Sequence, residues 1–238
     1  MGWFKNFVFI FSAIMVYLHI FIHFKINIYN EFNSITDVCK DNILSCIYYK
    51  LPFVFDGSTI IKPYDLKQCS KNKNDKFYIK TYEPMPMLEP GVKFFTNNTI
   101  YELSKPDKKI DIHSNLYCRN FYLIHSGKAS VYCIHPKYKE HLNSNKNKID
   151  KNEKNDKNEK TDTDKTNTDK TVYNKNVYDF IEKNDQILHL ELSPNSILFL
   201  PNYWYISIKA LEKNTVIEKI QYKTILNEIN FLYSKYIC

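Results

Sequence analysis

Residues 192–208 read LSPNSILFLPNYWYISI, and this stretch decides the fold class. It holds two short runs of β-branched and large apolar residues, at 197–200 and 205–208, with Pro194 before the first run and Pro201 between the two. Runs this short, bounded by Pro, Asn and Ser, are typical of β-strands and not of helices. The stretch therefore predicts two strands joined by a tight connection.

A second stretch, residues 120–136, repeats this layout as NFYLIHSGKASVYCIHP. Gly127 supplies a turn between one aromatic and β-branched run and a second such run that ends at Pro136. Further runs of the same kind occur at 76–82, 92–95, 187–192 and 215–222. Many short strands with turn residues between them predict a mainly β domain, either a β-sandwich or a jelly roll.

The two stretches together resemble the cupin-like, JmjC-related family typified by the asparaginyl hydroxylase that inhibits hypoxia-inducible factor. In that family a Pro-Gly-Asp turn is followed by a few apolar residues, a proline, two residues and an aromatic pair. The run Leu-Phe-Leu-Pro-Asn-Tyr-Trp at 198–204 is similar to that pattern, and the resemblance extends over residues 76–222. It implies a double-stranded β-helix, which is the cupin-like jelly roll, and an Fe(II)- and 2-oxoglutarate-dependent oxygenase as the family's activity.

The resemblance also implies where iron ligands would stand, and this chain departs from the family there. The family holds Fe(II) with a His-x-Asp/Glu pair and a distal His. Ile206 stands at the position of the distal His. Residues 111–115 read DIHSN, so His113 is one residue out of register and Asn115 replaces the carboxylate. We therefore expect a degenerate member, a pseudo-oxygenase with no catalytic residue and no metal site.

The position that receives 2-oxoglutarate in the family is changed as well. Ala129 stands where the resemblance places a lysine, and the neighbouring Lys128 should point to the opposite face because side chains alternate along a strand. We therefore expect no bound cofactor. An active oxygenase would need displaced metal ligands, for which the candidates are His113, Asp111 and His125.

The N-terminal segment predicts a membrane anchor. Residues 7–22 read FVFIFSAIMVYLHIFI without a charge, between Lys5 and Lys25. This is close to the ~20 apolar residues that cross a bilayer as a helix. A cleaved signal peptide would show a small-residue cleavage site, and a core helix would show a polar face; the segment has neither. We expect a single-pass anchor at 1–25, with the side of the membrane left open.

Two polar features bear on that topology and on partners. The triplet Asn97-Asn98-Thr99 is a glycosylation acceptor motif that would report on the side of the membrane.

Residues 143–176 hold nine lysines and seven acidic residues with almost no apolar side chain, which predicts a disordered Lys/Asn/Asp-rich insert. Because its charges nearly balance, the insert does not predict a nucleic-acid-binding tail.

The remaining segments complete the expected organisation. Residues 26–75 are expected to connect the anchor to the β domain and to pack on it, with a short helix at 35–49. The β domain is expected to span 76–238, and residues 225–236 carry apolar residues at a helical period, which predicts a C-terminal helix. The six cysteines show no C-x-x-C pair, and pairing among Cys39, Cys46 and Cys69 stays open.

Three functions follow as alternatives. The first is a membrane-anchored, catalytically inactive domain that acts as a binding or scaffold protein for a protein partner or for a second copy of itself. The second is an Fe(II)/2-oxoglutarate oxygenase with displaced ligands. The third is an unrelated β-rich membrane or surface protein. The net charge of +7 is spread along the chain and does not favour a nucleic acid as the partner.

Overall fold

The computed structural model describes residues 2–24, 33–34, 40–58, 69–71, 76–79, 88–89, 95–142, 178 and 180–224. The predicted insert at 143–176 and the predicted C-terminal helix at 225–236 lie outside the described residues.

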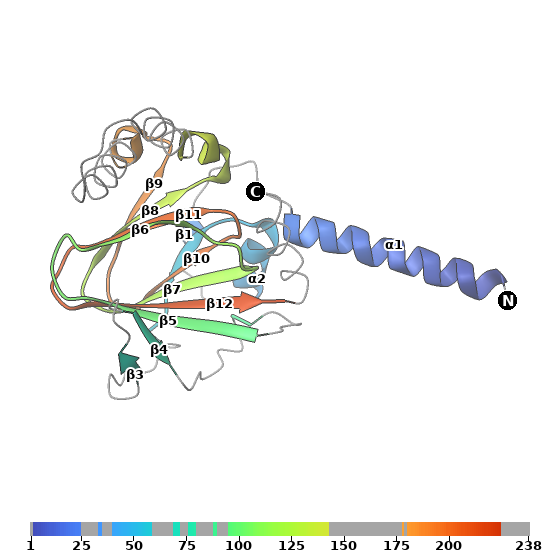
Figure 1. Ribbon diagram of the computed structural model, residues 1–238, viewed down its shortest axis with the longest axis horizontal. Coiled ribbons are helices and arrows are strands. Elements are labelled where there is room, and N and C mark those ends of the chain that lie inside the picture. The colour runs from blue at the N-terminus through green and yellow to red at the C-terminus, as the bar shows by residue number, and fades with distance from the viewer. Residues whose placement is uncertain are drawn as a thin grey trace, which may run out of the picture.

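Two β-sheets face each other and form the body of the protein (Figure 1). The larger sheet has the order β1 (Asn33–Ser34), β2 (Phe53–Asp56), β10 (Ser196–Leu200), β7 (Arg119–Ser126), β12 (Thr215–Lys223), β5 (Phe95–Leu103), β4 (Lys76–Ile79), β3 (Cys69–Lys71). The smaller sheet has the order β6 (Lys109–Ser114), β11 (Tyr205–Ala210), β8 (Ala129–Ile134), β9 (Leu188–Leu192). Neighbouring strands are antiparallel except in the short β1–β2 pair.

The chain passes back and forth between the two sheets from β5 to β12. Strands β5, β7, β10 and β12 lie together in the larger sheet, and β6, β8, β9 and β11 make up the smaller one. Eight strands that the chain distributes over two facing antiparallel sheets in this way form a jelly roll. The mainly β, jelly-roll prediction is therefore confirmed. The fold does not by itself assign an activity or a family, because jelly rolls serve many functions.

Strand β7 is apolar along nearly its whole length because both of its faces are buried. Tyr122 and Ile124 belong to the core between the sheets, while Phe121 and Leu123 lie on the outer face of the larger sheet. A strand buried on both faces reads as a continuous apolar run and not as an alternating one. This is why the stretch at 120–136 could be recognised from its sequence.

Helix α2 (Lys40–Tyr49) covers part of that outer face. Its buried residues Ile43 and Ile47 pack in one apolar cluster with Phe53 of β2 and Phe199 of β10. The rings of Phe53 and Phe199 stack at a centroid distance of 4.9 Å. The helix predicted at 35–49 is described in the structure from Lys40 to Tyr49. It covers the apolar cluster on the outer face of the larger sheet.

Two strands of the jelly roll were not predicted from the sequence. Strand β5 begins where the run at 92–95 ends, and β6 was not expected at all. Both hold residues that disfavour strands by local propensity, Asn97 and Asn98 in β5 and Asp111 in β6. In the structure Asn97 Nδ2 donates to Gln221 Oε1 at 3.3 Å, and Asn98 Nδ2 donates to Glu218 Oε1. Asn97 therefore sits inside a hydrogen-bonded strand and not in an open loop, which disfavours its use as a glycosylation acceptor.

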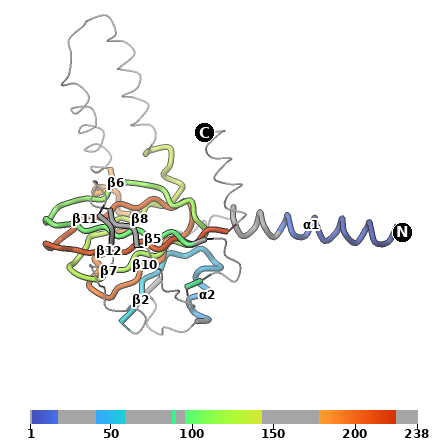
Figure 2. Tube along the Cα trace, turned by 60° about the horizontal axis from the view of Figure 1, so that its bottom comes forward, coloured from blue at the N-terminus to red at the C-terminus, as the bar shows by residue number. Residues whose placement is uncertain are grey.

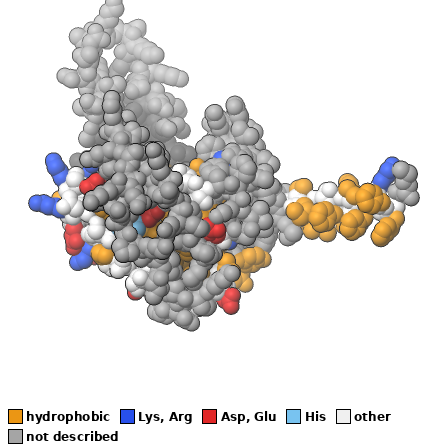
Figure 3. Space-filling model, turned by 90° about the horizontal axis from the view of Figure 1, so that it is seen from below, with side chains coloured by type: hydrophobic (Ala, Val, Ile, Leu, Met, Phe, Trp, Pro, Cys, Tyr) orange, Lys and Arg blue, Asp and Glu red, His pale blue; other side chains and the backbone are white. Residues whose placement is uncertain are grey.

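Helix α1 (Gly2–Phe24) projects away from the sheets (Figures 1 and 2). All side chains of residues 2–17 are exposed, and apolar atoms cover the helix in Figure 3. Within the described part of the chain, no helix is both long and apolar enough to cross a bilayer. The predicted helix is thus present, but its predicted transmembrane span is not borne out by the structure and stays a proposal.

Candidate functional site

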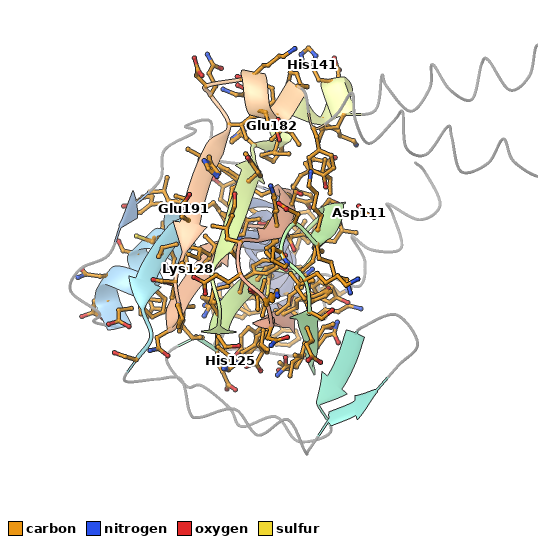
Figure 4. The ribbon with its side chains drawn as sticks, turned by 90° about the vertical axis from the view of Figure 1, so that its left-hand side faces the viewer. Asp111, His125, Lys128, His141, Glu182 and Glu191 are labelled. Atoms are coloured by element: carbon orange, nitrogen blue, oxygen red, sulfur yellow. The ribbon has the colours of Figure 1, made fainter. Side chains whose placement is uncertain are left out.

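The three candidate metal ligands lie in different places. His113 points from β6 into the space between the sheets, since its ring contacts Tyr122 and Lys219. His125 lies on the outer face of the larger sheet, where its Nε2 is 2.6 Å from Glu218 Oε2. Figure 4 shows Asp111 and His125 well apart. The displaced ligand set is therefore not assembled, and no group of three or more His, Cys, Asp or Glu side chains in the described ranges could hold a metal ion.

A β-bulge separates Asp111 from His113. Strand β6 pairs with β11 through His113 and Ile206, then through Ile110 and Ile208, with a register shift in between. Two residues of β6 thus stand against Ser207 alone, and such a bulge re-aims the side chains on its strand. Asp111 is exposed as a result, although strict alternation would place it on the same face as His113.

Ile206 stands where the resemblance places the distal iron-binding histidine. It is fully buried in the core between the sheets and pairs directly with His113 across the two strands. On β8, Ala129 is also buried in this core, whereas Lys128 is exposed and lies 3.4 Å from Glu212. Ile206 and Ala129, where the resemblance places the distal iron ligand and the 2-oxoglutarate lysine, are therefore aliphatic side chains that face the interior.

Both ring nitrogens of His113 lie within hydrogen-bond distance of a polar group. Its Nδ1 lies 2.9 Å from the backbone oxygen of Asp111, and its Nε2 lies 3.0 Å from Lys219 Nζ. A carbonyl oxygen only accepts and an ammonium group only donates, so Nδ1 carries the proton and Nε2 accepts. Both ring nitrogens of His113 therefore have polar partners. A metal ion at Nε2 would have to displace that ammonium group.

Asn115 connects the two sheets at this point. Its Nδ2 donates to the backbone oxygen of Trp204 at 3.3 Å, and its Oδ1 accepts from the Tyr122 hydroxyl at 2.7 Å. Burial raises the pKa of Tyr122 well above its ordinary value, so the phenol stays protonated and donates. Asn115, which stands where the resemblance places a carboxylate ligand, is completely buried and has both functional atoms engaged. It serves as a structural amide.

A second group of hydrogen-bonded amide side chains lies on the larger sheet. Gln221 Nε2 donates to Asn120 Oδ1 at 2.9 Å, and Asn120 Nδ2 donates to the backbone oxygen of Leu200 at 3.2 Å. We call these two hydrogen-bonded groups of side chains together the polar interior cluster; its members are His113, Asn115, Asn120, Tyr122, Lys219 and Gln221. The sequence carries one signal for this cluster. Lys219 and Gln221 alternate with Ile220 and Tyr222, but strand alternation alone suggests that the polar residues face solvent.

Trp204 lies in the same interior. Its side chain is completely buried, and its ring meets that of His135 edge to face at a centroid distance of 5.0 Å. Its Nε1 has no hydrogen-bond partner in the part of the chain that the structure describes. A buried donor of this kind is a site for an ordered water. Trp204 is therefore a core residue.

The cluster thus joins the two sheets through hydrogen bonds and presents no paired nucleophile and base. Its described contacts also place Lys219 Nζ 5.4 Å from the Tyr122 ring centroid. Fully matched polar networks in a core make its packing specific. The arrangement fits a structural role better than a catalytic one.

Comparison with known proteins finds structural neighbours of low similarity. No protein-family model matches it, and no curated protein matches it. Among solved structures, a cupin superfamily protein from Desulfitobacterium hafniense is 9% identical with a TM-score of 0.31, covering 65% of this chain and 83% of its own. The Drosophila melanogaster CENP-C cupin domain is 10% identical with a TM-score of 0.32, covering 65% and 74%. A structure of Drosophila melanogaster CENP-C bound to CAL1 is 9% identical with a TM-score of 0.30, covering 71% and 85%. With identities and TM-scores this low, these likenesses carry no conclusion about family or function.

Proposed function

We propose that this protein is held at a membrane by α1 and that its jelly-roll domain is a catalytically inactive binding or scaffold module. The observation that carries the proposal is the surface of α1. Trp3 is 83% exposed and Phe9 is 75% exposed, and large apolar side chains continue along the helix to Tyr17. A helix that is apolar all round has no face suited to water.

The exposed side chains of α1 would gain free energy in a lipid environment. Burying one large apolar side chain contributes about 1.5–3 kcal/mol. Trp3, Phe7 and Phe11 form an aromatic ladder along the helix, with centroid distances of 6.3 Å between successive rings. Contiguous apolar surface of this extent is typical of a membrane or protein interaction site. The single-pass arrangement expected from the sequence is the form that we propose.

The inactive character of the domain is supported by the polar interior cluster. Lys219 occupies the lone pair of His113, and Asn115 uses both of its functional atoms to tie β6 to β7 and β11. A site arranged for Fe(II) chemistry leaves its ligands' lone pairs facing an open position. The described arrangement favours a module that recognises a protein partner or a second copy, for which β9 at one edge of the smaller sheet offers strand addition.

Charged substitutions in α1 test the membrane part of the proposal. Phe7→Asp, Phe9→Asp and Phe11→Asp combined place three carboxylates within the apolar surface, and each costs about 2.5–3.5 kcal/mol at the centre of a membrane helix. The unsubstituted chain should float with neutral lipid vesicles in a density gradient, and the triple variant should lose more than nine-tenths of that binding.

A matched control uses the large apolar side chains that the domain itself exposes. Tyr48→Asp, Tyr49→Asp and Leu211→Asp combined should leave vesicle binding unchanged, because these exposed side chains do not belong to α1. Equal loss in both triple variants, or unchanged binding of the α1 variant, would contradict the proposed membrane attachment.

A further inference from the structure

The smaller sheet ends at β6 on one side and at β9 on the other, and these two edges differ. Strand β6 is interrupted by the bulge opposite Ser207 and carries the charged residues Lys109 and Asp111. Bulges and charges are common means by which proteins prevent pairing at a sheet edge. Strand β9 pairs with β8 without a register shift, and no described strand lies on its other side. Of the two edges, β9 is therefore the one suited to accept a further strand.

The two faces of β9 differ in their chemistry. Leu188 and Leu190 are partly buried and pack, like Val54 of β2, against the core between the sheets. His189 and Glu191 alternate with these leucines, so they lie on the outer face of the sheet, and both are exposed. Figure 4 shows Glu191 on this strand. An added strand with the same alternation would cover the leucines and meet a histidine and a carboxylate on the outer face.

The histidine of this edge is held in place by strand β8. His189 Nε2 lies 2.7 Å from Ser130 Oγ. The imidazole stacks on the Tyr132 ring at a centroid distance of 4.6 Å, with 16° between the ring planes. A side chain that is already ordered loses little conformational freedom when a partner binds. His189 is thus prearranged for a cross-strand contact with a longer and more flexible side chain, such as that of a glutamate.

The side chains of β9 select one register for pairing with a second copy of the same strand. In an antiparallel pair, residues directly opposite each other lie on the same face of the sheet. A two-fold axis at Leu190 places His189 opposite Glu191 of the second copy, and Leu188 opposite Leu192, and each of these pairs occurs twice. An axis at His189 or at Glu191 would instead place two like groups opposite each other, which is unfavourable. The register centred on Leu190 also pairs the strand over its full length.

We propose that two copies of this chain associate through β9, antiparallel and centred on Leu190, so that their smaller sheets form one continuous sheet. This inference rests on the proposed scaffold function and specifies its partner as a second copy. The contact is closed, because each copy uses the same edge and leaves no β9 edge for a third. Attachment of both copies to one membrane would raise their effective concentration, so a contact of one short strand from each copy is sufficient.

The test measures dimer formation by the full chain in detergent, using sedimentation equilibrium over a wide range of concentration. Glu191→Lys places an ammonium group opposite His189 and should raise the dimer dissociation constant about tenfold, because each dimer contains two such pairs. Glu212→Lys is the matched control, since it makes the same charge reversal at an exposed residue outside β9 and should leave the constant unchanged. His189→Glu combined with Glu191→Lys restores unlike groups across the strands and should recover the dimer.

A second readout reports the register. Chains of the double variant labelled with ¹⁴N and with ¹⁵N are mixed and treated with a carbodiimide, which joins a carboxylate to an amine in contact. We expect peptides of mixed isotope that are linked between the two substituted positions. A chain that stays monomeric, equal weakening by Glu191→Lys and Glu212→Lys, or no recovery in the double variant would overturn the proposal.

Flotation with lipid vesicles separates this inference from the proposed function. Glu191→Lys should float as the unsubstituted chain does, because β9 is not part of α1. A chain that floats but does not pair would overturn the pairing through β9 and leave membrane attachment standing. A chain that pairs through β9 but does not float would contradict membrane attachment alone.

Discussion

The contact between Lys219 and His113 shows how single residues determine what the interior of this jelly roll can do. A histidine facing the space between the sheets is a natural metal ligand, yet its Nε2 accepts from an ammonium group at 3.0 Å. Asn115 likewise has the position expected of a ligand and the hydrogen bonds of a structural amide. At this scale, His113 and Asn115 are held by contacts with other side chains and with the backbone.

The hydrogen bond from Tyr122 to Asn115 predicts a coupled effect on stability. Asn115→Ala should lower the free energy of unfolding by about 2–4 kcal/mol, because it strands a buried phenol hydroxyl and opens a cavity. Tyr122→Phe should cost about 1 kcal/mol, and the double variant should cost less than the sum of the two. Urea unfolding measures all three. Strictly additive effects would show that the two side chains do not interact.

Lys50, a buried lysine directly after α2, predicts a pH dependence of stability. Its pKa is lowered from 10.5 to about 8 in the folded chain, so the unfolded chain binds more protons between these values and stability rises with pH across that window. The gain should reach at most ~3 kcal/mol. Unfolding measured from pH 7.5 to 10.5 should show this rise, and Lys50→Met should reduce it. A parallel pH profile for the variant would contradict the assignment.

At the scale of elements, the turn between β7 and β8 depends on Gly127. Its φ is 71°, and a Cβ placed there would lie 2.9 Å from the backbone Cα of Thr215 and closer still to its hydroxyl. The conformation and the close approach of β12 both select glycine at this position. The glycine turn in the quoted stretch was therefore a dependable signal for a hairpin.

Gly127→Ala should consequently destabilise the chain by about 2–4 kcal/mol in urea unfolding, because both the backbone and Thr215 would have to move. Asn214→Gly is the matched control. Asn214 also has a positive φ, of 57°, but it is exposed, so glycine there should change stability by no more than about 0.5 kcal/mol. A loss of the same size in both variants would assign the effect to general turn chemistry and not to the approach of β12.

Elements with strong local patterns could be predicted from the sequence, whereas those stabilised by distant partners could not. The run at 129–134 coincides with β8 because its inward residues are apolar and its ends are marked by Gly127 and Pro136. Strand β5 escaped prediction because its asparagines hydrogen-bond to Gln221 and Glu218, more than a hundred residues away in the sequence. The same is true of the polar interior cluster, since the pairing of Lys219 with His113 depends on the facing of two sheets. The bulge that exposes Asp111 has no recognisable signal in its six-residue strand.

For the whole molecule, two features act together. The jelly roll closes one core between its sheets and a second beneath α2, so the domain buries its own apolar residues. Helix α1 leaves its apolar side chains exposed, and Figure 3 shows them extending beyond the rest of the molecule. A closed domain joined to an apolar helix is consistent with a module displayed at a membrane. The proposed function thus combines a jelly-roll scaffold, an interior filled by side chains and a helix whose apolar side chains are exposed.

The central claim of the proposed function is that this jelly roll does not carry out the iron chemistry that the sequence resemblance implies. The most direct test is to purify the full chain in detergent without oxygen, reconstitute it with Fe(II), and measure bound iron and 2-oxoglutarate turnover together. The account predicts far less than one iron per chain and no decarboxylation of 2-oxoglutarate, because Lys219 holds the lone pair of His113 and Ile206 offers no ligand. One iron per chain with sustained 2-oxoglutarate turnover would contradict it.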